Sequence, residues 1–246
     1  MKTLLAILLL LASSPLAAAD LTVSAASSLT ESFRAIAAAY ERQHPGVTVD
    51  LNFAASGVLL QQIVRGAPVD VFASADEETM QQALRGGHID AATRQVFARN
   101  TLWVVVPPGA AVRPASLRDL AGPAVTRVAV GNPDSVPVGR YARGALQQAG
   151  LWPAVQAKAI STQNVRQSLD YVARGEVDAG FVYATDAQAA GSRVQRAFEV
   201  AVKDGIRYPL AMVGGTARAT EARRFIAFVQ SPQGQAILRR NGFSSP

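Results

Sequence analysis

The sequence predicts an α/β fold with two lobes, each a mainly parallel sheet flanked by helices. Short apolar runs alternate with amphipathic helical patterns along most of the chain. Repeated β-α units of this kind form parallel sheets whose faces are covered by helices. A break at Pro107-Pro108-Gly109 separates two such series, which indicates two lobes rather than one sheet.

Residues 1–19 have the features of a cleavable export signal. Lys2 supplies a positive start, residues 4–12 are an apolar run, and Ala17-Ala18-Ala19 is a small-residue cleavage site. The apolar run is too short to span a bilayer. We expect the mature chain to begin at Asp20, in the periplasm; the alternative is an uncleaved anchor. The 246-residue sequence has no cysteine for lipid attachment, which favours a free periplasmic protein over a lipoprotein.

The first series of elements begins with a strand at 21–25. In the helix that follows, Leu29, Phe33, Ile36 and Tyr40 recur at helical spacing, and the sequence His44-Pro45-Gly46 ends it. The later elements of this series are expected to be a strand at 47–53, a helix through 60–64, a strand at 69–73 and a helix at 77–84.

The second series follows a strongly β-like strand at 101–106. Its expected elements are a strand at 127–130, a helix at 138–149, a strand at 158–160, a helix at 165–173 and a strand at 179–183. The chain then continues with a strand at 207–213 and terminal helices at 221–229 and 233–239. Because 101–106 and 207–213 are natural crossovers, we assign residues 20–102 plus 206–246 to lobe 1 and residues 103–205 to lobe 2.

Several turns between an apolar strand and a helix carry small polar residues. Free backbone N–H groups and hydroxyls at the positive end of a helix dipole suit an anion. Ser28 is one candidate, although Ser28-Leu29-Thr30-Glu31 is also a capping-box pattern. Ser56 is another; its simpler interpretation is a helix cap, and the adjacent Gly57 permits close backbone approach.

Three further candidates come from the second series. Val138 follows Pro137 at the start of a helix, and Val165 follows Asn164 in a similar place. Both valine side chains are expected in the core, so that binding would come from their N–H groups. Tyr183 ends the strand at 179–183. Its hydroxyl either bonds to solvent or backbone or donates into a cleft.

Charge and motifs exclude several classes of function. The formal net charge is +6, and the basic residues are scattered among acids, which favours a dispersed basic surface over a steering field for anions. Aromatic residues do not interleave with them, so nucleic-acid binding is not expected. Nucleophile-elbow, P-loop and dinucleotide-binding motifs are missing. The only histidines, His44 and His88, lie in turns, and no cluster has zinc-ligand spacing.

We therefore expect no enzyme and no cofactor. The turns belong to a longer series of segments that follow one another along the chain: Ala25-Ala26-Ser27-Ser28-Leu29-Thr30, Phe53-Ala54-Ala55-Ser56, residues 66–76 (GAPVDVFASAD), Ala129-Val130-Gly131-Asn132-Pro133, Val136-Pro137-Val138-Gly139-Arg140-Tyr141-Ala142, Asn164-Val165-Arg166 and Phe181-Val182-Tyr183. With these segments in this order, the sequence resembles the periplasmic molybdate-binding proteins of bacterial ABC importers over essentially the whole mature chain.

The resemblance implies a type II periplasmic binding protein, in which two strands cross between lobes and an oxyanion sits in the cleft. In that family two serines of the first lobe contribute hydroxyl and amide donors, and they match Ser28 and Ser56. Two backbone amides and a tyrosine hydroxyl of the second lobe match Val138, Val165 and Tyr183. Molybdenum would be held only as molybdate, through these five residues. The family often has alanine at the position of Val138, and often has serines at the positions of Ala55 and Gly57.

The implied ligands are molybdate and tungstate, and the implied partner is an inner-membrane ABC permease that receives them from a monomer. Other anions on the same fold, such as sulfate, phosphate or a small organic anion, remain alternatives. So does a periplasmic hydrolase that uses Ser28 or Ser56, although it lacks a positioned base. The effector half of a transcription regulator shares such folds, but the export signal and the lack of an N-terminal DNA-binding segment oppose it.

Overall fold

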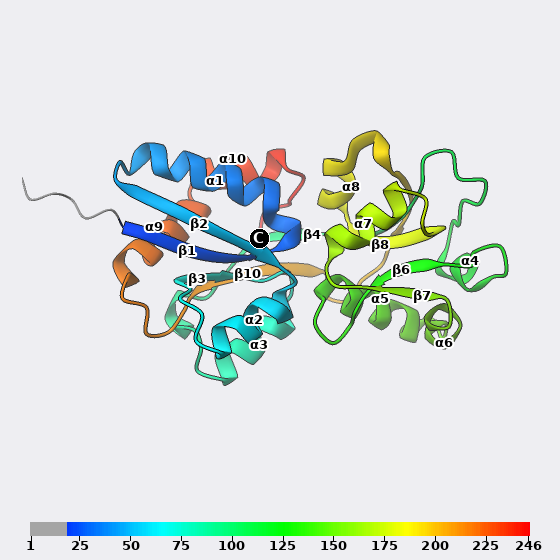
Figure 1. Cartoon of the computed structure of the whole chain (residues 1–246), viewed down its shortest axis with the longest axis horizontal. Coiled ribbons are helices and arrows are strands. Elements are labelled where there is room, and N and C mark those ends of the chain that lie inside the picture. The colour runs from blue at the N-terminus through cyan, green and yellow to red at the C-terminus, as the bar shows by residue number, and fades with distance from the viewer. Residues whose placement is uncertain (1–18) are drawn as a thin grey trace, which may run out of the picture.

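The computed structural model describes residues 19–246. The predicted signal peptide and its cleavage site lie outside this range, apart from Ala19. Figure 1 shows two halves side by side, each built around one sheet with helices on its faces. The predicted α/β class is confirmed, and the two sheets hold five strands each.

The sheet of the first half has the strand order β2-β1-β3-β10-β4. Strands β1, β2 and β3 are mutually parallel, whereas β10 runs antiparallel to both β3 and β4. The bounds of these strands are Ala19–Ala26 (β1), Val47–Ala54 (β2), Val71–Ala73 (β3), Gln95–Asn100 (β4) and Ile206–Met212 (β10). Four of the five strands therefore run in the same direction and only β10 is reversed, so the sheet is mixed but mainly parallel, as predicted.

Helices cover both faces of this sheet. In Figure 1, α1 and α10 lie on one side of it and α2 and α3 on the other. The helix bounds are Thr30–Gln43 (α1), Ser56–Val64 (α2), Glu77–Arg85 (α3), Ala219–Gln230 (α9) and Pro232–Arg240 (α10). Because β1 is covered on both faces, its alternate residues Leu21, Val23 and Ala25 are fully buried on one face and Ser24 is fully buried on the other.

The second half repeats the plan with the strand order β7-β6-β8-β5-β9. Strands β6, β7 and β8 are parallel, and β5 is antiparallel to β8 and β9. The strands are Leu102–Val106 (β5), Val128–Gly131 (β6), Ala159–Thr162 (β7), Ala179–Tyr183 (β8) and Gln195–Val200 (β9). The helices are Leu117–Ala121 (α4), Pro137–Gln148 (α5), Trp152–Gln156 (α6), Val165–Ala173 (α7) and Ala184–Ala190 (α8).

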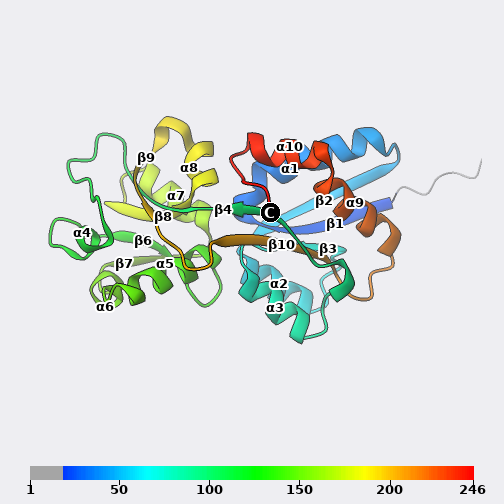
Figure 2. The same cartoon turned by 180° about the vertical axis from the view of Figure 1, so that it is seen from behind.

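The chain passes between the halves twice, from β4 to β5 and from β9 to β10. Figure 2 shows both passages from behind, with α9 and α10 returned to the first half. The sequence did not predict β4 and β9, which lie at sheet edges. Both carry arginine and glutamine among their apolar residues, because one side of an edge strand meets water.

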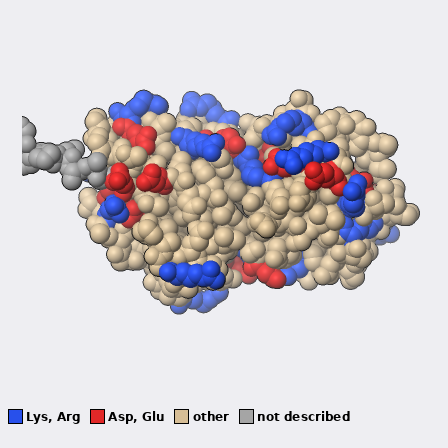
Figure 3. Space-filling model, viewed as in Figure 1, with Lys and Arg blue, Asp and Glu red and all other residues tan. Residues whose placement is uncertain are grey.

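Charge is dispersed over the surface. Figure 3 shows lysine and arginine side chains over both halves and interspersed with acidic side chains on the face in view. This agrees with the interpretation of the positive net charge as a dispersed basic surface. Within residues 19–246, no helix is both long enough and apolar enough to cross a membrane.

Candidate functional site

Segments from both halves converge on one small cavity at their junction. The first half contributes the ends of β1 and β2 and the residues that follow them, together with a residue after β3. The second half contributes the starts of α5 and α7 and the end of β8. The cavity volume is about 10 Å³, room for roughly one water-sized body. Its lining residues are Ala26, Ser27, Ser28, Ala54, Ala55, Ser56, Ala75, Val136, Pro137, Val138, Val165 and Tyr183.

All five residues proposed from the sequence therefore line the same cavity. Ser28 lies in a short 3-10 helix, η1 (Ser27–Leu29), which joins β1 to α1. The capping box expected there does not form: the cap of α1 is Leu29, and it makes no side-chain cap bond. The carboxylate of Glu31 instead pairs with Arg166 of the second half. The Ser28 hydroxyl is thus free of the helix end and lies 3.0 Å from the hydroxyl of Tyr208.

Ser56 is the first residue of α2, and it also does not cap that helix. Ala55 occupies the cap position, without a side-chain bond. The Ser56 oxygen instead accepts a hydrogen bond of 3.0 Å from the backbone N–H of Ala75. Because this lone pair is engaged and the side chain is fully buried, the hydroxyl hydrogen remains as a donor at the cavity wall.

Val138 and Val165 begin helices of the second half, and their side chains are buried, as expected from the sequence. First-turn amides of a helix have no partner four residues earlier. Within residues 19–246, neither of these two N–H groups donates to a protein atom. Asn164 caps α7 by accepting from the N–H of Gln167 at 3.0 Å, which leaves the Val165 amide free.

Close packing places the start of α5. A Cβ added to Gly139 would lie 1.8 Å from the backbone oxygen of Gly131, at the end of β6. Only glycine permits this approach, because any other residue would push the helix off the sheet. The Val138 amide therefore owes its position to the glycine beside it.

Tyr183 is the last residue of β8 and is 1% exposed. Its backbone N–H donates to the carboxylate of Asp186 at 3.2 Å, while its buried hydroxyl has no partner in the described part of the chain. Burial raises the pKa of Tyr183 well above its ordinary value, so the phenol stays protonated. An unpaired buried hydroxyl costs free energy, which a ligand that accepts its hydrogen recovers.

Within residues 19–246, no charged side chain lines the cavity. Two arginines of the second half flank it instead, and both are paired with acids. Arg140 Nε lies 2.7 Å from Asp76 Oδ2, and its Nη2 donates to Thr79 at 2.6 Å. Both charged side chains of this pair are nearly buried, at 9% and 4% exposure. The pair therefore joins α5 to the start of α3 across the junction.

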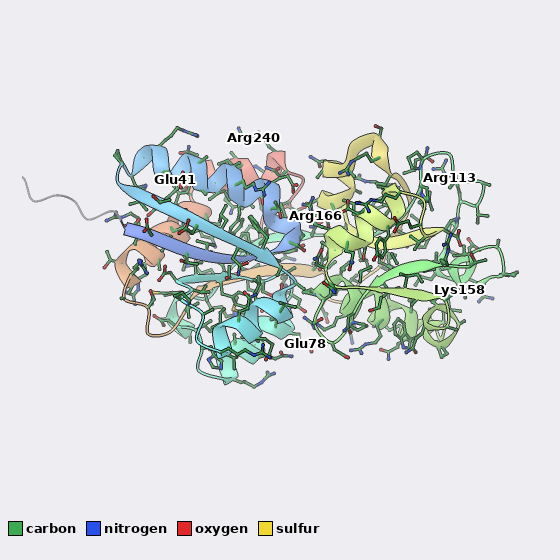
Figure 4. All side chains as sticks on the ribbon, in the orientation of Figure 1. Glu41, Glu78, Arg113, Lys158, Arg166 and Arg240 are labelled. Carbon is green, nitrogen blue, oxygen red and sulfur yellow. The ribbon has the colours of Figure 1, made fainter. Side chains whose placement is uncertain are left out.

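Arg166 joins the two halves on the other side of the cavity, and Figure 4 shows it at their junction. It binds both carboxylate oxygens of Glu31, and its Nε donates to the backbone oxygen of Ser27 at 3.3 Å. The same Nε lies 3.0 Å from Asp186 Oδ1 at ion-pair distance. Burial raises the pKa of Asp186 to about 6, and the Arg166 charge opposes this shift.

A backbone hydrogen bond also joins the two halves, between the first turn of α2 and the residues before α5. The N–H of Gly57 donates to the oxygen of Ser135 at 3.0 Å. Together with the two arginine contacts, this bond holds the halves in a closed arrangement around the cavity. The sequence suggested close approach at Gly57 but did not suggest Tyr208, Arg140 or Arg166. Their partners are far away along the chain, although a single hydroxyl in the otherwise apolar centre of β10 is a weak indication for Tyr208.

The cavity combines hydrogen-bond donors with an otherwise apolar lining. Neither His44 nor His88 lines it, so its serines have no imidazole beside them. In the described residues, no group of three histidine or acidic side chains is placed to hold a metal ion. What the cavity does hold is hydrogen-bond donors from both halves.

Comparisons with known proteins agree with this geometry. Residues 21–244 match the family of bacterial extracellular solute-binding proteins. The molybdate-binding protein ModA of Escherichia coli is 36% identical over 91% of this chain and 88% of its own length. The solved periplasmic molybdate-binding protein of Azotobacter vinelandii superposes with a TM-score of 0.80 at 25% identity, over 92% of this chain and 99% of that one.

The fold extends to proteins named for other anions. The sulfate-binding protein SubI of Mycobacterium tuberculosis superposes with a TM-score of 0.78 at 20% identity, over 92% of this chain and 87% of that one. This likeness concerns the fold alone, which is that of the type II periplasmic binding proteins. The chain therefore belongs to the bacterial extracellular solute-binding proteins, and within them to the family of the periplasmic molybdate-binding proteins.

Proposed function

We propose that this protein captures molybdate, and also tungstate, in the cavity between its halves and delivers the ion to an inner-membrane ABC permease. It acts as a monomer in the periplasm after removal of residues 1–19. Residues 20–102 with 206–246 form one moving body, and residues 103–205 form the other. Supporting this proposal are the family to which the chain belongs and the curated relatives named for molybdate.

The observation that carries the proposal is a cavity lined by donors without a charged acceptor. The five donors are the hydroxyls of Ser28, Ser56 and Tyr183 and the amides of Val138 and Val165. A buried dianion must replace its hydration with donors. Each hydrogen bond to a charged group contributes about 1.5–3 kcal/mol. Five of them total about 7.5–15 kcal/mol, and the upper end of that range covers an association cost of about 4 kcal/mol and still leaves more than the roughly 8 kcal/mol that micromolar affinity requires.

The same donors favour a fully ionised oxyanion. A hydrogen phosphate ion carries an O–H group, which needs an acceptor, whereas the five groups are placed to donate and each serine oxygen already accepts one hydrogen bond. A buried donor left unpaired costs about 1–3 kcal/mol, so phosphate binds more weakly. Molybdate, tungstate and sulfate are all fully ionised, so donors alone suit all three, and the preference for the two larger ions is what a titration must measure.

Binding favours the closed arrangement because the donors are divided between the halves. An ion in the cavity reaches both serines and both helix starts only when the junction is closed, so its differential affinity shifts the population toward closure. The permease then recognises the closed form. Small-angle scattering of the protein with and without molybdate checks this step, and identical profiles would contradict it.

Calorimetric titration of residues 20–246 with molybdate, tungstate, sulfate and phosphate tests the proposed ligand. We expect one-to-one binding of the two larger oxyanions, weaker binding of sulfate and the weakest binding of phosphate. A preference for sulfate would keep the fold and the donor set but change the transported ion. The absence of heat with all four anions would refute the assignment of the cavity.

A further inference from the structure

A second layer of buried polar groups lies behind Ser28, on the strands that connect the two halves. The Ser28 oxygen is 3.0 Å from the hydroxyl oxygen of Tyr208, on β10. The Tyr208 oxygen is in turn 3.4 Å from Nδ2 of Asn100, at the end of β4. Ser28 and Tyr208 are at most 3% exposed and Asn100 is 7% exposed, so water does not compete for these bonds.

The orientation of the Asn100 amide sets the direction of this chain of bonds. The Asn100 side-chain oxygen accepts from the N–H of Thr101 at 2.9 Å, which places the NH2 group on the other side. One amide hydrogen goes to the Thr185 hydroxyl at 2.9 Å, and the other goes to Tyr208. An amide nitrogen only donates, so the Tyr208 oxygen accepts here.

The single hydrogen of Tyr208 must then go to Ser28. Burial raises the pKa of Tyr208 well above its ordinary value, so this hydrogen is retained. The Ser28 oxygen accepts it, and the hydrogen of the serine is left to point away from Tyr208. Ser28 lines the cavity, and the cavity is where an acceptor is expected.

We propose that Tyr208 is a positioning residue that fixes the Ser28 hydroxyl as a donor into the cavity and so contributes to selection against protonated oxyanions. This inference rests on the proposed function, because it concerns how the same cavity recognises its ion. The backbone N–H of Ala75 has the same effect on Ser56, because it donates a hydrogen bond of 3.0 Å to the Ser56 hydroxyl oxygen. Both serine oxygens therefore already accept one hydrogen bond from behind, which leaves their hydrogens to donate into the cavity.

Tyr208→Phe tests the role of the hydroxyl while keeping the ring. The ring packs edge-on against Phe97, Tyr183 and Phe243, with centroids 5.2–6.3 Å away, and phenylalanine retains these contacts. We expect molybdate affinity to fall by about tenfold, the scale of one hydrogen bond. Tyr40→Phe is the matched control: it removes a buried tyrosine hydroxyl that bonds to Glu221 on α9, away from the cavity, and should leave affinity unchanged.

A double-mutant cycle with Ser28→Ala shows whether Tyr208 acts through the serine. If it does, Tyr208→Phe has no further effect on affinity once Ser28 has lost its hydroxyl. An undiminished tenfold effect in the Ser28→Ala background would overturn the inference. Thermal unfolding of each variant shows that the proteins compared are folded at the temperature of titration.

Selectivity gives a readout that a purely structural role would not change. Without Tyr208, the Ser28 hydroxyl can rotate and accept, so the affinity for phosphate relative to sulfate should rise by about tenfold. An unchanged ratio together with unchanged molybdate affinity would also overturn the inference. Failure of the wild-type protein to bind any of the four oxyanions would instead refute the proposed function, so the two failures are distinguishable.

Discussion

The two halves line the cavity with different kinds of donor. The first half presents the hydroxyls of Ser28 and Ser56, whose oxygens already accept hydrogen bonds from Tyr208 and from the Ala75 amide. The second half presents two backbone amides at helix starts and a single side-chain hydroxyl, that of Tyr183. In the first half the donor is fixed by side-chain identity. In the second it is fixed mainly by where a helix begins.

This difference decides how each half tolerates sequence change. A hydroxyl is lost in one substitution, whereas an amide persists under any residue except proline. The Val138 side chain is buried, and its backbone N–H would remain after substitution by any residue except proline. In the second half, the residue on which the Val138 amide depends is Gly139, because its close approach to Gly131 places the start of α5.

The largest effect is expected from a change that keeps the two halves apart. Although the family often has serine at this position, in this chain a Cβ on Gly57 would lie 2.6 Å from the backbone oxygen of Ser135, so Gly57→Ala prevents the closed contact formed here. Without closure the ion loses the three donors of the second half, each worth at least about 1.5 kcal/mol, and affinity falls by at least about 1,000-fold. Titration with molybdate measures this loss.

Gly144→Ala is the control for the Gly57 variant. Gly144 lies inside α5, and an added Cβ there has no atom within 4 Å. We expect its affinity to be unchanged and its stability to rise slightly, because alanine favours the helix. Wild-type affinity in Gly57→Ala would show that the junction closes differently from the arrangement described here.

A pair of substitutions compares the two kinds of donor directly. Ser56→Ala removes a hydroxyl and leaves the Ala75 amide unpaired, so both affinity and stability fall; the loss of affinity is about 10- to 100-fold. Val165→Ala removes buried methyl groups but keeps the amide, so stability falls while affinity changes by less than about threefold. Titration and thermal unfolding of both variants separate these effects. A large loss of affinity in Val165→Ala would mean that its side chain, not its amide, shapes the cavity.

The same contrast explains what the sequence could predict. Ser28, Ser56, Val138, Val165 and Tyr183 lie at strand ends or helix starts, which local periodicity and turn residues reveal. The fold class followed for the same reason, since buried strands and amphipathic helices are local patterns. The five positions were identified as a set, however, by a resemblance to a known family rather than by spacing.

The remaining features depend on contacts that no local pattern encodes. The pattern Ser28-Leu29-Thr30-Glu31 predicted a capping box, yet Glu31 bonds to Arg166, 135 residues away in sequence. Tyr208 reaches Ser28 across 180 residues. Strands β4 and β9 escaped prediction because edge strands with exposed arginine and glutamine lack a clear apolar alternation.

The smallest loss of affinity expected from removing a donor concerns Tyr183, the one side-chain donor that the second half contributes to the cavity. Its buried hydroxyl has no partner in the described residues, so Tyr183→Phe relieves an unpaired group in the ligand-free protein. We expect the ligand-free form to become more stable by about 1 kcal/mol, and molybdate affinity to fall by about tenfold. Thermal unfolding without ligand measures the expected gain in stability, and titration with molybdate measures the expected loss of affinity. A loss of stability without a loss of affinity would instead make Tyr183 a structural residue, and would leave the second half with backbone donors alone.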